Sequence, residues 1–366
     1  MRTTALNEIT LMQYIVLIHS SQVGTGIFSL PRKIADSSGT DGWISILIAW
    51  AANTLAGCVI LLVMRKYPDD TLPDLFRKLF GKAVGKLLLI PVIAYYSYYG
   101  FSVLVNSMLY IKAWFLPYTP GYLIVLLFAV PTFMIVRNGM RVLGRYVEIV
   151  FYMMAWMPLF LLIPLDQGHW IHLLPVLKEG WKPIVRGVHD TLFSFAGMET
   201  LFFIYPFLRD KKRAFHGLFI ASSLTLVLYL FVTISCFVLF APDEIGMLNQ
   251  PLMNLLKTIE FRFLERFDMI FLALYLFVVS RCWILYSFSA IYSASRLFDR
   301  PDHTKPAAVF LVIAAAIVFV HQPTWNEADR SETVLTILNE WYMFAFPVVL
   351  YVAVKGKELL GRLRSE

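Results

Sequence analysis

Apolar runs of about 20 residues recur along the whole chain and are separated by short polar stretches. Runs of this length match the roughly 30 Å hydrocarbon core of a bilayer, where a helix satisfies its own backbone hydrogen bonds. A transmembrane β-barrel would instead show short segments of alternating polarity. The pattern predicts an all-α integral membrane protein with ten transmembrane helices, at about 10–31, 42–64, 87–115, 119–136, 142–165, 185–208, 214–241, 268–297, 306–321 and 333–354.

Two of the polar connections are themselves patterned as helices. In residues 68–86, apolar side chains recur at helical spacing with basic residues opposite, which predicts a helix lying on the membrane surface. Residues 243–265 also have a helical pattern and are predicted to cap an outer vestibule. The pattern indicates no separate soluble domain, so we expect a single membrane domain over residues 1–366.

Two predicted spans, 10–31 and 185–208, carry helix-breaking residues deep inside their apolar runs. These residues are Gly24, Gly26 and Pro31 in the first span, and Gly197 and Pro206 in the second. Glycine adopts backbone angles that other residues resist, so we expect the helices to unwind there. Hydrocarbon cannot satisfy the freed N–H and C=O groups, whereas a polar solute, an ion or trapped water can. The positive end of the next half-helix would favour a carboxylate or another electron-rich group.

The two interrupted spans occupy matching places in the chain. Ten spans divide into halves of five, 1–165 and 166–366, and an odd number of spans gives the halves opposite orientations. Interrupted helices at corresponding positions of inverted repeats indicate the binding site of secondary transporters. A second interpretation is that the glycines only allow close helix packing. The matched pair favours a 5+5 inverted repeat with broken helices 1 and 6 and a small-solute site between them.

Composition supports a membrane protein. Hydrophobic residues make up 58% of the chain and charged residues 16%, against roughly 25% charged in soluble domains, and the mean hydropathy is +0.66. The net charge of +7 does not indicate nucleic-acid binding, because the basic residues lie in short blocks between apolar runs. Of the 32 Lys and Arg residues, 21 fall on the side of the termini and nine on the other side. This asymmetry predicts that both termini are cytoplasmic.

Catalytic and metal-binding patterns are missing from the sequence. The three cysteines, Cys58, Cys236 and Cys282, all lie within apolar runs, and the Cys/His spacings of zinc sites do not occur. There is no HExxH motif, nucleophile elbow or phosphate-binding loop. We therefore expect no enzymatic activity, no metal and no cofactor.

Two ionisable residues inside predicted spans are candidates for function, because charge is costly in the bilayer. Arg281 lies near the middle of the eighth span and should face the bundle interior towards an acceptor. Glu199 follows Gly197 at the break of the sixth span. It could pair with Arg281, accept hydrogen bonds from exposed N–H groups, or carry a proton. The simplest interpretation is that it fixes the broken helix.

Hydroxyl groups in the third and eighth spans are further candidates. A tyrosine could close over a ligand with both an aromatic face and a hydroxyl, and we expect Tyr96 or Tyr99 to line the pocket. Ser287 could also contact a ligand, although serines in membrane helices often bond to carbonyl groups of their own helix.

Four motifs resemble a known family: VGTGIFSLPR at 23–32, DGW at 41–43, SFAGMET at 194–200 and ERFD at 265–268. They resemble the B subunit of endospore germinant receptors, a family similar to the amino acid–polyamine–organocation transporters with the leucine-transporter-type fold. The resemblance implies a subunit that binds a small nutrient germinant, such as an amino acid or sugar, in the inner spore membrane. It also implies a larger A-type membrane subunit and a lipoprotein C-type subunit as partners. The alternative is a proton- or sodium-coupled amino-acid transporter.

In the fold that this resemblance implies, the eighth span lies beside the first. Arg281 could then bind an anionic group of the ligand near Gly24 and Gly26, or replace the sodium ion that related transporters hold there. A structural ion pair or a carbonyl contact is the other interpretation. The expected ligand-binding residues are Val23, Gly24, Thr25, Gly26, Tyr96, Tyr99, Ala196, Gly197, Met198, Glu199, Arg281 and Ser287.

Overall fold

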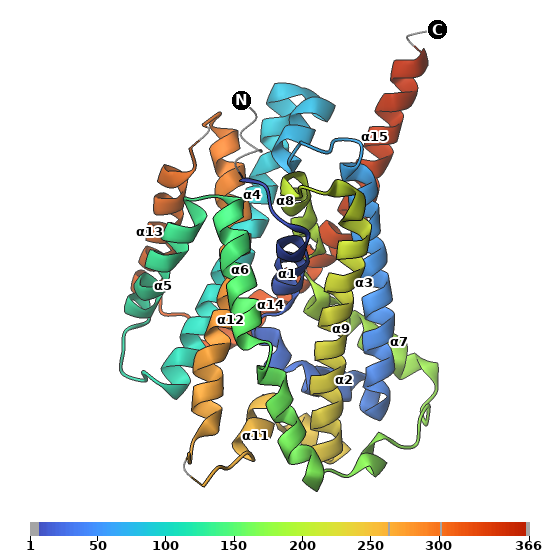
Figure 1. The fold of residues 1–366 in the computed structure, drawn as a ribbon, viewed down its shortest axis with the longest axis vertical. Helices are drawn as coiled ribbons and strands as arrows, with labels where there is room; N and C mark the ends of the chain where they lie inside the picture. Colours follow the sequence, from blue (N-terminus) through green and yellow to red (C-terminus); the bar gives the residue numbers. More distant parts are fainter. Residues whose placement is uncertain (1–6, 263, 301, 364–366) are drawn as a thin grey trace.

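The computed structural model describes residues 7–262, 264–300 and 302–363, which form a helical bundle (Figure 1). Within this part of the chain, the β contacts are two isolated bridges. The α-helices are α1 (Leu11–Gln22), α2 (Leu30–Ser38), α3 (Gly42–Met64), α4 (Leu72–Trp114), α5 (Gly121–Val136), α6 (Met140–Met154), α7 (Trp181–Leu192), α8 (Leu201–Ile204), α9 (Ala214–Leu239), α10 (Pro242–Met247), α11 (Pro251–Lys257), α12 (Phe267–Leu297), α13 (Thr304–Val320), α14 (Trp325–Glu340) and α15 (Phe346–Leu363).

The lengths of these helices confirm a multi-pass membrane protein. Among the described residues, six helical stretches are long and apolar enough to cross a bilayer, and they are Leu30–Met64, Leu72–Trp114, Met140–Gln167, Lys211–Leu239, Phe267–Leu297 and Trp325–Leu359. The shorter apolar helices α5 and α13 have 16 and 17 residues. Each of the two spans predicted to be broken begins with a helix of 12 residues, which is α1 in one span and α7 in the other. The predicted count of ten therefore requires that each broken helix be counted as one span.

The first broken helix extends further than predicted. The sequence places its end at residue 31, but α2 runs from Leu30 to Ser38. Pro31 lies in the first turn of α2, where a missing backbone N–H costs no hydrogen bond. The proline therefore begins the second half of the helix instead of ending it.

The long helix α4 contains a bend at Gly81, whose φ of +83° and ψ of 175° are not helical. The part before the bend was predicted to lie on the membrane surface, and protein covers part of its apolar face. Leu75 and Phe76 are almost completely buried, and the Phe76 ring lies 6.0 Å from that of Phe346 in α15. This short helix therefore packs its apolar side on the bundle itself.

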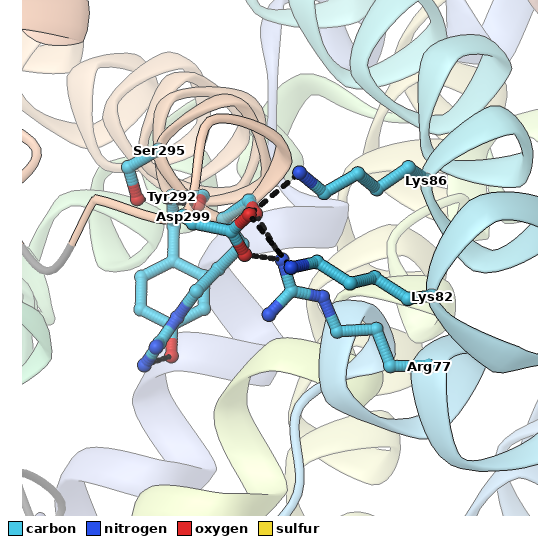
Figure 2. Close-up of polar contacts among 7 residues, drawn as sticks. Arg77, Lys82, Lys86, Tyr292, Ser295 and Asp299 are labelled. Carbon is cyan, nitrogen blue, oxygen red and sulfur yellow. Dashed lines mark hydrogen bonds and ion pairs between the residues drawn. The ribbon is translucent and has the colours of Figure 1, made fainter.

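Asp299, just beyond α12, connects the bend of α4 to the end of α12. Its carboxylate accepts a hydrogen bond from Lys86 Nζ at 2.6 Å and forms an ion pair with Arg77 (Figure 2).

The other end of the bundle is capped by α10 and α11, so the predicted helical character of 243–265 is confirmed for its first half. The end of α15 lies at the opposite end of the bundle from α11 (Figure 1). Residues 1–6 and 364–366 lie outside the described part, and so do the termini predicted to be cytoplasmic.

Helices α1 and α12 form the centre of the bundle. Helix α12 lies along α4 and also contacts α1 and α6, while α1 packs on α6 and α9. The 3₁₀ turn Met198–Thr200, between α7 and α8, touches both α1 and α12. The two broken helices therefore meet in the interior, with α4 and α12 beside them.

Candidate ligand-binding site

The first break separates α1 from α2. Helix α1 ends at Gln22, Val23 and Gly24 are extended, and a 3₁₀ turn covers Thr25–Phe28. Gly24 has a φ of −120°, and Gly26 is not among the described glycines with positive φ. The expectation that these two glycines are needed for unusual backbone angles is therefore wrong. Gly26 is exposed, and a Cβ built on it would meet no atom within 4 Å, so open space lies beside this break.

The second break separates α7 from α8 and is buried. Ala196 is extended, and Gly197 has a φ of +130°, an angle that side-chain-bearing residues rarely adopt. A Cβ on Gly197 would also lie 2.4 Å from Ser21 Oγ of α1. Glycine is therefore required here both for the backbone angle and for the approach of the two broken helices.

Side chains of the protein hold the carbonyl groups of the two breaks. The Tyr229 hydroxyl lies 2.7 Å from the carbonyl oxygen of Gln22 and 2.8 Å from that of Ser194, so it bridges the breaks. The Tyr275 hydroxyl donates to the Gly24 carbonyl at 2.8 Å. We expected a solute, an ion or water to satisfy such groups, and for these carbonyls that expectation is wrong.

Asn53 was not identified from the sequence, although it reaches the second break from α3. Its Nδ2 donates to the Phe195 carbonyl at 2.9 Å, and its side chain is fully buried. An amide within an otherwise apolar span is a signal that could have identified it, because an unpaired amide is costly there. Tyr229 and Tyr275 had no such signal, since they are two of 18 tyrosines.

Glu199 is fully buried and its carboxylate has three hydrogen-bond donors. Oε1 accepts from the hydroxyls of Tyr95 and Tyr286, both at 2.8 Å, and Oε2 accepts from the Gly197 N–H at 3.0 Å. The geometry supports the interpretation that Glu199 fixes the broken helix, since the donors come from tyrosines and the backbone and not from Arg281.

Aromatic rings surround this carboxylate. Tyr96 donates to the Glu199 backbone carbonyl at 2.9 Å, and the Tyr99 ring stacks on Tyr286 with centroids 3.8 Å apart. Tyr96 therefore contacts Glu199 directly, and Tyr99 contacts it through Tyr286. The Tyr95 ring stacks on Tyr342, which lies in a π-helical turn at Trp341–Ala345.

Ser287 lies in α12, one residue after Tyr286. It is buried at the contact between α12 and α4, where a Cβ on Gly100 would lie 3.0 Å from Ser287 Oγ. Its neighbour Tyr286 instead turns its hydroxyl to Glu199. Among the described residues, Ser287 has no hydrogen bond to either break, whereas Tyr229 and Tyr275 bond to the breaks directly.

Arg281 is buried beside α1 with an incomplete set of acceptors. Its Nε donates to the Val278 carbonyl at 3.1 Å, while Nη1 is buried without a hydrogen-bond partner among the described residues. The next residue, Cys282, has its Sγ 3.6 Å from the Ser21 carbonyl oxygen. With Tyr275 bound to Gly24, residues on both sides of Arg281 contact the first broken helix.

Together, these features define the class of protein: a helical membrane protein with the leucine-transporter-type fold and broken first and sixth helices. Three solved transporters have this fold. Mhp1, a nucleobase-cation-symport-1 family transporter with bromovinylhydantoin bound, superimposes with a TM-score of 0.70 over 96% of this chain and 79% of its own, at 11% identity. A Na⁺-coupled sialic acid symporter superimposes with a TM-score of 0.64, over 93% of this chain and 79% of the symporter, at 11% sequence identity. MhsT in complex with L-phenylalanine superimposes with a TM-score of 0.59, over 91% of this chain and 87% of MhsT, at 13% sequence identity.

The sequence comparisons identify the family. The model of the family described as "Spore germination protein" matches residues 8–328, and the chain belongs to this family. It is 26% identical to spore germination protein YndE of Bacillus subtilis over 361 residues, which cover 96% of this chain and 98% of YndE. It is 23% identical to spore germination protein GerQB of Bacillus cereus over 353 residues, which cover 94% of this chain and 95% of GerQB.

Proposed function

We propose that this protein is the membrane subunit of a spore germinant receptor and binds a small nutrient germinant, an amino acid or a sugar, between the two breaks. The observation that carries the proposal is the pair of facing breaks with open space beside Gly26. The three solved structures with this fold are described with small molecules: sialic acid, bromovinylhydantoin and L-phenylalanine. Family membership supplies the link to germination.

The proposed ligand contacts come from both breaks and from α4 and α12. Gly24, Thr25 and Gly26 are at least partly exposed and would offer backbone groups to the ligand. Arg281 would hold an anionic group of the ligand, because its buried Nη1 has no protein acceptor among the described residues. A buried guanidinium with an unfilled position favours a carboxylate, which accepts two parallel hydrogen bonds from arginine. This makes an amino acid the preferred ligand over a neutral sugar.

In this proposal the protein senses the ligand and has no catalytic role. Binding would shift the bundle between alternative arrangements in proportion to the ligand's differential affinity for them. The shift would pass to a larger A-type membrane subunit and a lipoprotein C-type subunit in the inner spore membrane. Both termini would be cytoplasmic, and residues 1–165 and 166–366 would form the two inverted repeats.

A thermal-shift screen of amino acids, sugars and nucleosides with the purified chain tests ligand binding directly. A ligand that prefers the folded state raises the midpoint of unfolding, by an amount that grows with its concentration over Kd. We expect a single chemical class of nutrient to raise it. A flat response across all classes would count against a ligand-binding subunit.

The alternative is a secondary transporter, which the two ion-coupled symporters among the fold relatives favour. Uptake by the purified chain in liposomes separates the two functions. We expect binding without accumulation inside the vesicles. Accumulation driven by a proton or sodium gradient would instead indicate a transporter, and genes for a large membrane subunit and a lipoprotein beside this gene would favour the receptor.

A further inference from the structure

A groove with a volume of about 420 Å³ lies between α4, α12 and α13, away from the two breaks. Apolar side chains line most of it, including Ile93 of α4, Ala294 of α12, and Val309 and Ile313 of α13. Ala290 and Ala294 are small, and they leave room where larger side chains would fill the space. The groove therefore has an apolar lining and a volume that an apolar chain could occupy.

The groove is open to the surroundings of the bundle. Phe298, Val309 and Ile313 have 68%, 58% and 52% of their surfaces exposed, although all three are large and apolar. On a helix that crosses a bilayer, such exposed side chains face the hydrocarbon of lipids. From Lys305 to Ile313 a helix rises about 12 Å, so the groove reaches that far into the bilayer from its end at residue 305.

Cations line one end of the groove. Arg300 and Lys305 are both exposed there, and neither has an ion-pair partner among the described residues. Lys86 of α4 lies two helical turns before Ile93, on the same face. The nearby carboxylate of Asp299 is engaged by Lys86 and Arg77 (Figure 2). The Asp302 carboxylate accepts from the Thr304 N–H at 2.9 Å.

The net charge at this end of the groove is positive even with both acids included. Arg77, Lys82, Lys86, Arg300 and Lys305 are five cations, and Asp299 and Asp302 are two anions. Lysine and arginine at the ends of membrane helices attract anionic head groups, and the attraction falls off within a Debye length. An apolar groove that ends in unpaired cations at the bilayer surface matches a molecule with one anionic end and one hydrocarbon end.

We propose that this groove binds one anionic phospholipid, with its phosphate at Arg300 and Lys305 and an acyl chain along Ala294, Val309 and Ile313. A neutral phospholipid would fill the groove but leave the two cations unmatched. A second copy of the chain would bury the apolar walls without supplying a phosphate. The proposal does not depend on which germinant the protein binds.

Native mass spectrometry of the purified full-length chain tests the proposal, with phosphatidylglycerol and phosphatidylcholine of identical acyl chains as probes. We expect phosphatidylglycerol to bind more tightly. The double variant Arg300→Gln/Lys305→Gln should lose roughly 25-fold in affinity for it, about fivefold for each cation removed. The matched control Lys212→Gln/Arg213→Gln removes two cations before α9, on the other side of the bundle, and should bind like the wild type (Figure 1).

Equal binding of the two lipids, or equal losses in the two double variants, would overturn the proposal. A second variant, Ala294→Phe, fills the groove and leaves every charge in place. It should reduce phosphatidylglycerol binding at least fivefold, with the wild-type elution volume on size exclusion as the check on folding. If Ala294→Phe instead abolishes a dimer and leaves lipid binding unchanged, the groove is an interface between two copies and the lipid assignment is wrong.

Discussion

Glu199 and Arg281 are both fully buried ionisable residues near the breaks, but their surroundings differ. The carboxylate of Glu199 receives three hydrogen bonds from Tyr95, Tyr286 and the Gly197 N–H. The guanidinium of Arg281 donates to one carbonyl, and Nη1 has no partner among the described residues. Removing one member of a buried hydrogen-bonded network leaves its partners unpaired and is destabilising, whereas a buried charge without a full set of partners itself costs stability. This difference fits the proposal that Glu199 holds the broken helix in place and that Arg281 binds the ligand.

The largest effect is expected when Glu199 is removed. Glu199→Ala leaves the buried Tyr286 hydroxyl and the Gly197 N–H without an acceptor, and leaves the Tyr95 hydroxyl with only the longer bond to Asn339 Oδ1 at 3.3 Å. Each unpaired group costs about 1–3 kcal/mol, so we expect a loss of about 4 kcal/mol in folding free energy. Thermal unfolding of the purified protein measures it. The control Glu340→Ala removes a partly exposed carboxylate near His189 and should cost less than about 1 kcal/mol. Equal losses for the two variants would show that the Glu199 network adds nothing to stability.

The two breaks should respond differently to an added methyl group. Gly197→Ala combines a positive φ with a Cβ that meets Ser21, and should cost about 3 kcal/mol. Gly26→Ala places its methyl group in open space and should change folding by less than about 1 kcal/mol. The unfolding midpoints of the two variants provide the comparison. A larger loss for Gly26→Ala than for Gly197→Ala would show that the second break is not the one that requires glycine.

Arg281→Met should not lower the folding stability as Glu199→Ala does. It removes a buried charge without a complete set of partners and keeps much of the apolar volume, so we expect stability unchanged or about 1 kcal/mol higher. The same unfolding assay measures the change. A loss as large as that of Glu199→Ala would mean that Arg281 is part of the structural network.

The smallest effect concerns Asp299 at the surface. Hydrogen bonds from Lys86 and Arg77 lower the pKa of its carboxyl to about 2, from about 3.9 in an unfolded chain. Because the folded pKa is the lower one, the contribution to stability is present above about pH 4 and is lost as the pH falls through about 2. Asp299→Asn tolerates the φ of +56° at this position. The difference in midpoint between wild type and Asp299→Asn should stay constant from pH 8 to pH 5, and a difference that disappears between pH 7 and pH 5 would refute the pairing.

Much of the fold could be predicted from hydrophobic runs and helix-breaking residues. The predicted span 42–64 has the bounds of α3, and the break at Gly197 is confirmed. The continuation of α2 to Ser38 was missed because proline can begin a helix as well as end one. The packing of residues 72–80 on α15 was missed because an apolar face does not indicate whether lipid or protein covers it.

The site could be predicted only in part. Arg281 and Glu199 were found because charge inside an apolar span is rare. Their separation could not be predicted, because it depends on how α12 is rotated against α1 and α4. The tyrosines that hold the breaks, Tyr229 and Tyr275, could not be distinguished from the tyrosines that only pack, since a hydroxyl finds its acceptor through three-dimensional geometry.

The most direct test of the central claim is a thermal-shift comparison of wild type and Arg281→Met with L-amino acids, their C-terminal amides and neutral sugars. We predict that at least one amino acid raises the wild-type midpoint, and that its amide does so much less. The same amino acid should have no effect on folded Arg281→Met, because the acceptor for Nη1 is the ligand's carboxylate. An equal shift in both proteins, or by amino acid and amide alike, would contradict the account.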